Sequence, residues 1–206
     1  MIFDLSSAQN FLRRQLTSSV VVVAAMCSPL VALVSADAAE TYSIDGSHTA
    51  VVFKISHLGF SNTYGRFNTV EGKFTLDREA VEKSAVSIKV KSESVDTNDA
   101  KRDKHLRSPD FFNVKLHPEI SFTSTAVKKL SETEFEVTGN MLLNGVTKPL
   151  TLKLTKLGEG TDPGGNHRIG FDTTVSIKRS EFNMNYMVGA VGDDVTLMIS
   201  TEGVRQ

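Results

Sequence analysis

The strict alternation of side chains from Ala50 to His57 is the feature that most constrains the fold of this chain. On an extended backbone, one face carries Val51, Phe53, Ile55 and His57, and the other face carries Ala50, Val52, Lys54 and Ser56. A period of two over this length predicts a β-strand with one apolar face. The chain turns at 58–62 and continues towards Leu76, so we expect a hairpin with aromatic side chains on one side.

The same alternation recurs downstream and predicts further strands at about 85–91, 119–127, 134–143, 148–154, 168–178 and 195–201. Asn144-Gly145 favours a type I′ turn, because both residues tolerate positive φ. The glycine-rich stretch 158–166 predicts a flexible loop. Many short strands are typical of a sandwich or a closed barrel, and about eight strands can close around one ligand.

One polar segment breaks the β pattern and predicts a short helix at about 99–107. Thr97 or Asn98 can cap its start, and Pro109 stops it. The segment has few apolar residues, so we expect a surface element or a lid. The apolar pair Phe111-Phe112 follows it and would hold it against the barrel.

The N-terminus has the organisation of a secretory signal peptide. Arg13 and Arg14 precede an apolar run at 20–34, and Ala36-Asp37-Ala38 follows it. We expect residues 1–38 to be removed after Ala38 and residues 39–206 to form one domain. The alternative is a membrane anchor, but the run is shorter than the roughly 20 residues of a span and contains Pro29.

The charge and cysteine content exclude several classes of function. The formal net charge is −1 and no basic block stands out, so nucleic acid is not expected as a partner. The single cysteine, Cys27, lies within the expected signal peptide. The mature domain therefore makes no disulfide and depends on core packing, for which its length is sufficient.

An ordered set of short motifs resembles the YceI-like family of periplasmic polyisoprenoid-binding proteins. The set comprises Ile44-Asp45, His48, Val51, Phe53, Ile55, His57-Leu58-Gly59, Gly65-Arg66-Phe67, Glu71-Gly72, Phe74, Asp96-Thr97, Asp103, His105 to Ser108, Asp110 to Phe112, Pro118, Ile120, Phe122, Gly139, Met141, Leu143, Gly145 to Pro149, Arg179-Ser180 and Phe182. Each motif is weak alone, and their order across the mature chain is specific. Tyr42 and Asn183 depart from the family pattern, which has tryptophan and glycine there.

The resemblance implies an all-β protein, an eight-stranded antiparallel lipocalin-like barrel with a short capping helix. It also implies a periplasmic carrier whose interior tunnel takes a polyprenyl compound, an isoprenoid quinone or a fatty-acid derivative. No other cofactor is expected. The residues do not choose among these ligands, and they leave the oligomeric state open, a homodimer included.

The expected tunnel lining consists of apolar side chains with one histidine. These residues are Phe53, Ile55, His57, Phe67, Phe74, Ile88, Val90, Phe111, Phe112, Ile120, Phe122, Met141, Phe171, Phe182 and Met184. On the residues alone, a solid core is an equal alternative, and the protein would then be a secreted stress-related or interaction module. A barrel that spans a membrane would reverse the observed pattern, because its polar side chains would face the lumen.

Metal binding and catalysis are both weakly indicated. His48 and His57 are nine positions apart, an odd spacing, and are therefore expected on opposite strand faces. Asp45 beside His48 lacks an activated nucleophile, so we expect no enzyme, and Asp45 is expected to cap the turn after it. His57 is expected to hydrogen-bond either a ligand head group or loop backbone.

The polar residues near the expected helix allow two roles. Arg102 and Arg179 either bind an anionic head group or pair with Asp96, Asp103 or Asp110. We expect the segment 99–107 and the loop 183–194 to gate the tunnel.

Overall fold

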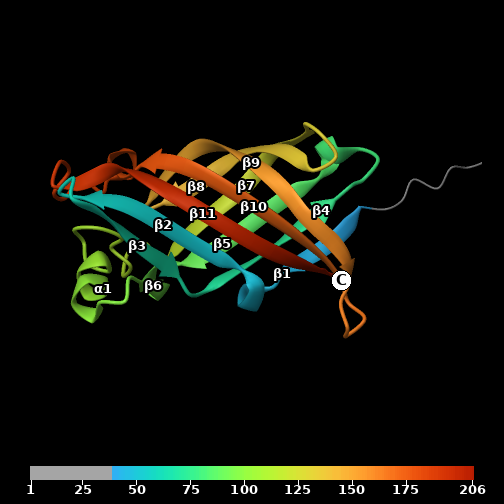
Figure 1. Ribbon diagram of the computed structural model, residues 1–206. Helices are drawn as coiled ribbons and strands as arrows, with labels where there is room; N and C mark the ends of the chain where they lie inside the picture. The colour runs from blue at the N-terminus through green and yellow to red at the C-terminus, as the bar shows by residue number, and fades with distance from the viewer. Residues whose placement is uncertain (1–38) are drawn as a thin grey trace, which may run out of the picture. The chain divides into compact units, whose positions relative to one another are not determined.

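The strands of the computed structural model, which describes residues 39–206, close into an antiparallel β-barrel with one α-helix at its side (Figure 1). The strand segments are β1 (Glu40–Ile44), β2 (Ala50–His57), β3 (Ser61–Phe67), β4 (Val70–Leu76), β5 (Ala85–Lys91), β6 (Val95–Asp96), β7 (Glu119–Lys129), β8 (Glu134–Leu143), β9 (Val146–Thr161), β10 (His167–Lys178) and β11 (Val191–Arg205). The helix α1 is Ala100–Leu106.

These segments combine into eight long strands, because three pairs of consecutive segments share the same neighbours. β1 and β2 both pair with β11 and are separated by the short 3-10 helix Gly46–His48. β3 and β4 pair with β2 and β1, and β6 and β5 then pair with β3 and β4. Every neighbouring pair is antiparallel, and the pairing of β1 with β11 closes the ring.

The predicted alternation explains which side chains face the interior. Val51 and Phe53 of β2 are buried, and Phe135, Val137 and Met141 of β8 repeat the pattern. Most buried apolar residues form one core cluster. A second cluster contains Tyr42, Phe74, Phe135, Ile169 and Phe171, and it is built around the stacked rings of Tyr42 and Phe74 at 4.8 Å.

Local hydrogen bonds fix the helix that the sequence predicts. The Asp99 side chain accepts from the Arg102 N–H at 2.8 Å and caps the helix, so the expectation that Thr97 or Asn98 caps it is wrong. Asp103 is buried, and it accepts from the N–H and the hydroxyl of Thr97 at 2.9 and 2.5 Å. These bonds hold α1 against β6, so the expectation of a capping helix is confirmed.

The two ends of the barrel differ in character (Figure 1). One end carries α1, the β2–β3 turn, the β8–β9 turn and the connection from β10 to β11. The other end carries the β4–β5, β7–β8 and β9–β10 connections together with β1 and the C-terminus. The second aromatic cluster lies towards this latter end.

The prediction of a flexible loop over 158–166 is wrong for its first half. β9 runs to Thr161, and the connection to β10 is confined to 162–166. Gly158 and Gly160 lie opposite Gly170 and Arg168 in the sheet. Backbone pairing sets this register, whereas glycines provide no side-chain alternation from which a strand can be predicted. The expected signal peptide, 1–38, lies outside the described residues.

Candidate ligand cavity and its mouth

The barrel encloses a cavity of about 350 Å³ whose wall is mainly apolar. Side chains from β2, β5, β7, β8, β9, β10 and β11 line it, together with residues around α1 and on the β10–β11 connection. The residues on this wall that the sequence predicted are Phe53, Ile55, His57, Phe67, Ile88, Val90, Phe111, Phe112, Ile120, Phe122, Met141 and Met184. The alternation of the strands therefore brings most of the expected lining residues together.

The three other predicted lining residues lie elsewhere. Phe74 and Phe171 line a second, smaller cavity of about 80 Å³. Phe182 is 3% exposed and packs in the main core, outside both cavity walls. The two cavities share Ile88, Phe122, Leu152, Ile199 and Thr201 in their walls, so they adjoin along the barrel interior.

Several wall residues were absent from the sequence prediction. They are mainly β-branched and leucine residues of the later strands: Val51, Leu150, Leu152, Val175, Ile177, Val195, Leu197 and Ile199. Their period of two was visible in the sequence, and extending the same rule to β9, β10 and β11 would have found them. The aliphatic residues in the predicted lining came only from the earlier strands, namely Ile55, Ile88, Val90 and Ile120.

The cavity reaches the surface at the end of the barrel that carries α1. The exposed members of its wall are His57, Arg102, His105, Tyr186 and Met187. They come from the end of β2, from α1 and from the β10–β11 connection, which lie at the same end of the molecule in Figure 1. We call this opening the mouth.

An aromatic cluster covers part of the mouth. The rings of His105, Phe111 and Tyr186 contact one another edge to face, with centroids 5.0 to 5.5 Å apart. His105 also bonds Asp110 through Nε2 at 2.9 Å. Deeper in the cavity, Phe112 packs edge-on to Phe67 with centroids 5.4 Å apart. The segment after α1 therefore joins the mouth to the interior through aromatic contacts.

Two guanidinium groups belong to the wall near the mouth, and neither forms an ion pair with Asp96, Asp103 or Asp110. Arg102 donates from Nε to the Thr97 hydroxyl and from a terminal nitrogen to the Thr97 carbonyl, both at 2.7 Å. Arg179 is 2% exposed.

The buried Arg179 donates to three backbone carbonyls, that of Met184 in the β10–β11 connection and those of Val191 and Gly192 at the start of β11, at 2.7 to 3.0 Å. Burial lowers the pKa of this guanidinium, and the negative charge of Asp193 opposes that effect. The carboxylate of Asp193 bonds the N–H and the hydroxyl of Ser180. Arg179 thus holds the loop beside the mouth by hydrogen bonds to neutral acceptors.

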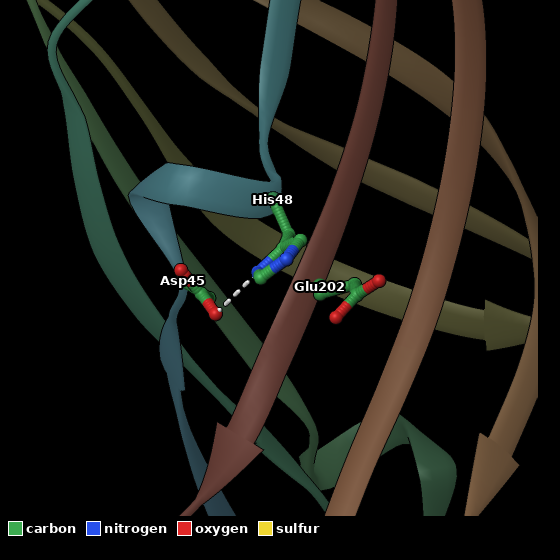
Figure 2. A group of neighbouring side chains, drawn as sticks. All are labelled: Asp45, His48 and Glu202. Carbon is green, nitrogen blue, oxygen red and sulfur yellow. Dashed lines mark hydrogen bonds and ion pairs between the residues drawn. The ribbon is translucent and has the colours of Figure 1, made fainter. Parts of the chain in front are cut away.

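Three side chains of the type that bind metal ions, Asp45, His48 and Glu202, lie close together beside the 3-10 helix Gly46–His48 (Figure 2). Arg168 already pairs with this group, because its Nη1 atom lies 2.7 Å from Asp45 Oδ2 and 3.1 Å from Glu202 Oε2. This ion pair, with help from Ser47 and His48, holds the pKa of Asp45 far below its usual range. The arrangement is an ion-pair network, and a divalent cation would have to compete with Arg168.

The same residues do not form a catalytic triad. Ser47 Oγ lies 3.2 Å from His48 Nδ1, and Asp45 Oδ2 lies 2.8 Å from that same nitrogen. A relay needs the serine and the carboxylate on different ring nitrogens. Asp45 also accepts from the Ser47 N–H at 2.9 Å, which is the turn-capping bond expected from the sequence.

The structure defines a class of protein, the closed antiparallel β-barrels with an apolar interior cavity. The chain belongs to the YceI-like family, because the YceI-like domain matches residues 42–203. A UPF0312 protein of Pectobacterium carotovorum is 47% identical over 173 residues, which cover 84% of this chain and 90% of that protein. A protein YceI of Salmonella arizonae is 48% identical over 174 residues, with the same coverages of 84% and 90%.

Solved structures share the fold. Campylobacter jejuni YceI protein superposes with a TM-score of 0.65 at 29% identity, covering 73% of this chain and 90% of that one. BcnA of Burkholderia cenocepacia has a TM-score of 0.71 at 21% identity, with 77% and 98% covered. A polyisoprenoid binding domain from Saccharophagus degradans has a TM-score of 0.61 at 14% identity, with 80% and 98% covered. Within residues 39–206, no helix is long and apolar enough to cross a membrane.

Proposed function

We propose that this protein binds a long-chain amphiphile inside its barrel and carries it through the periplasm. The ligand class is a polyisoprenoid, an isoprenoid quinone or a fatty-acid derivative. The observation that carries the proposal is the apolar cavity of about 350 Å³, whose wall includes exposed polar and aromatic residues at the mouth. The name of the Saccharophagus degradans neighbour, a polyisoprenoid binding domain, supports the same ligand class.

The cavity suits a hydrocarbon chain for a simple physical reason. Burial of one methylene group contributes about 0.8 kcal/mol, so ten of them supply about 8 kcal/mol before the chain is ordered. Directed polar contacts are therefore unnecessary along the wall. The hydrocarbon chain of the ligand extends inward past Phe53 and Phe122 towards the second cavity. Its head group stays among His57, Arg102 and His105 at the mouth.

The arrangement of the polar residues that the structure brings together supports a binding function without catalysis. The Asp45–Ser47–His48 group is arranged as a capped turn and lies beside Arg168. None of these three residues lines the cavity, whereas Thr49, the next residue in the sequence, does. We therefore propose a binding protein, with residues 39–206 as its functional domain.

Mass spectrometry of co-purified lipid tests the proposal. The mature domain is purified without detergent after export to a bacterial periplasm, and organic extracts are weighed. We expect one long-chain amphiphile per barrel. Protein that carries no lipid and takes up neither a polyprenol nor a long-chain fatty acid would favour the alternative of a secreted interaction module.

The periplasmic location is tested separately. Export with cleavage after Ala38 predicts that protein from the periplasm begins at Ala39, as determined by N-terminal sequencing. Protein that keeps Met1 and fractionates with the cytoplasm would contradict export.

A further inference from the structure

Large apolar side chains are exposed on two loops beside the mouth. Phe60, in the β2–β3 turn, is 89% exposed, and Leu58 before it is 49% exposed. On the β10–β11 connection, Met187 is 50%, Val188 47% and Tyr186 42% exposed. Exposed apolar residues that gather in one place mark an interaction surface, whereas scattered ones need no explanation.

The two loops lie side by side. The Leu58 N–H donates to the Ala190 carbonyl at 2.7 Å, which ties the β2–β3 turn to the β10–β11 connection. Leu58 and Met187 both have φ of 52°, a left-handed conformation that bulky side chains rarely adopt. The fold thus keeps large apolar residues at turn positions that glycine or asparagine would occupy at lower cost. We call Leu58, Phe60, Tyr186, Met187 and Val188 the apolar rim.

The rim is continuous with the cavity. Tyr186 and Met187 are exposed and also line the cavity wall, and His57 of that wall precedes Leu58 directly. A hydrocarbon chain that leaves the cavity therefore meets the rim before it meets bulk water. Hydrocarbon transfer into water carries a large free-energy cost, so a route that stays apolar lowers the barrier to exchange.

Two lysines near the mouth indicate which kind of partner the apolar rim binds. Lys101 and Lys104 of α1 are exposed, and within residues 39–206 neither has a carboxylate oxygen at ion-pair distance. Basic residues beside apolar side chains match the interface of an anionic bilayer. A second copy of this chain would present the same lysines and repel them.

We propose that the apolar rim docks on the surface of an anionic phospholipid bilayer and presents the mouth to the lipid. This docking rests on the proposed function, because its purpose is to exchange an amphiphile between the barrel and a membrane. In the docked state, Phe60 and Val188 insert between the acyl chains near the headgroups, and Lys101 and Lys104 contact lipid phosphates.

Vesicle co-sedimentation of the mature domain tests the docking. The vesicles contain phosphatidylcholine with or without phosphatidylglycerol, and the proteins are the wild type, the double variant F60D/V188D and the control L157D. Phe60 and Val188 lie outside the cavity wall, so the double variant leaves the ligand site intact. Leu157 is 61% exposed on β9 and is as apolar, but it lies away from the mouth.

We expect wild type and L157D to bind vesicles equally, more strongly with phosphatidylglycerol and more weakly at high salt. F60D/V188D should lose about tenfold or more in vesicle affinity. Equal binding by all three proteins, or no binding by wild type, would overturn the docking. A wild-type dimer that F60D/V188D converts to monomer, without vesicle binding, would assign the rim to a second copy.

Lipid binding measured without vesicles separates this proposal from the proposed function. A fluorescent fatty acid titrated into each protein should bind wild type and F60D/V188D alike. If it binds both but the vesicles bind neither, the carrier function stands and the docking fails. If the vesicles bind wild type selectively but no amphiphile enters any of the proteins, the carrier function fails.

Discussion

At the scale of single residues, Phe53 distinguishes a cavity wall from a solid core. Its ring is 8% exposed and lies 5.9 Å from Phe67, centroid to centroid, and a Cβ placed on Gly65 would overlap it. The remaining side of the ring faces the cavity. Phe53→Ala should therefore cost less than the roughly 3–5 kcal/mol of a tightly packed phenylalanine. Retention of co-purified lipid should fall at the same time.

Phe182→Ala is the matched control for that variant. Phe182 is buried in the main core and touches neither cavity, so its truncation should cost the full roughly 3–5 kcal/mol while bound lipid changes little. Urea unfolding and lipid extraction on both variants provide the comparison. Equal destabilisation by the two changes, with lipid retained in both, would mean that Phe53 belongs to a solid core.

Arg102 provides a second test at this scale, because it is exposed at the mouth and forms no ion pair with a carboxylate of residues 39–206. An amphiphile with a carboxylate or phosphate head should bind more tightly than the alcohol of the same chain. A charge-assisted hydrogen bond contributes about 1.5–3 kcal/mol, so the preference should be about tenfold or more. In Arg102→Gln the preference for the charged head group should shrink, while the affinity for the alcohol stays unchanged. Titration of both ligands into both proteins measures this, and an unchanged preference would place the head group elsewhere.

Residue identity could be predicted where alternation and chemistry agree. Phe53 and Ile55 follow from a period of two, and the capping role of Asp45 follows from the turn it precedes. Arg168 was not foreseen as the partner of Asp45, because the two are 123 positions apart and only the register of β10 and β11 brings them together. Phe182 was misplaced because a short 3-10 helix turns its side chain into the core.

At the scale of elements, α1 is the part of the mouth best suited to open. The helix has seven residues, and Leu106 together with Phe112 after it packs against the main core. Such a segment opens locally at low free-energy cost. Bound lipid should slow amide exchange in residues 98–113 and in the 183–194 loop more than in the Asn144-Gly145 turn. Hydrogen exchange with and without a polyprenol measures this.

The Asn144-Gly145 turn is a strict internal control for that experiment. Asn144 is buried and donates from Nδ2 to the Phe182 carbonyl at 3.1 Å, so the turn is held whether or not lipid is present. Equal protection in both places, or protection confined to the turn, would place the entrance away from α1.

Secondary-structure elements could be predicted where their side chains show a clear pattern. The strand at 85–91 and the helix near 99–107 were placed to within one residue, because alternation and capping residues define them. β1 and the two-residue β6 were not assigned, since segments this short contain too few alternations to be distinguished from loop. The predicted strand at 148–154 ends earlier than β9, because Gly158 and Gly160 interrupt the side-chain alternation in the last part of β9.

At the scale of the whole molecule, the barrel closes where its first strand meets its last strand. β1 pairs with β11, and Arg168 on β10 links three carboxylates around that seam. It bonds Asp45 at 2.7 Å, Glu202 at 3.1 Å and Asp162 at 2.6 Å. The network therefore connects the segment between β1 and β2, the β9–β10 connection and the last strand at the end opposite the mouth.

Acid should weaken this closure in a predictable direction. Arg168 holds the pKa values of Asp45 and Asp162 well below the usual value of about 3.9. Groups whose pKa is depressed in the folded state stabilise it fully above the unfolded pKa, and this contribution is lost as the pH falls below about 4. Arg168→Met should therefore lower the free energy of unfolding at pH 7, and the difference from wild type should shrink progressively below pH 4.

Urea unfolding at pH 7, 4 and 3 measures that difference, with Arg66→Met as the control. Arg66 is an exposed arginine of β3 that has no carboxylate of residues 39–206 at ion-pair distance, so its loss should change stability little at any of the three pH values. Because acid removes the charge of the carboxylates but leaves the packing of the Arg168 side chain, the two contributions separate along the pH axis. A deficit in Arg168→Met that stays the same from pH 7 to pH 3 would assign the closure to packing and to β1–β11 pairing instead of charge.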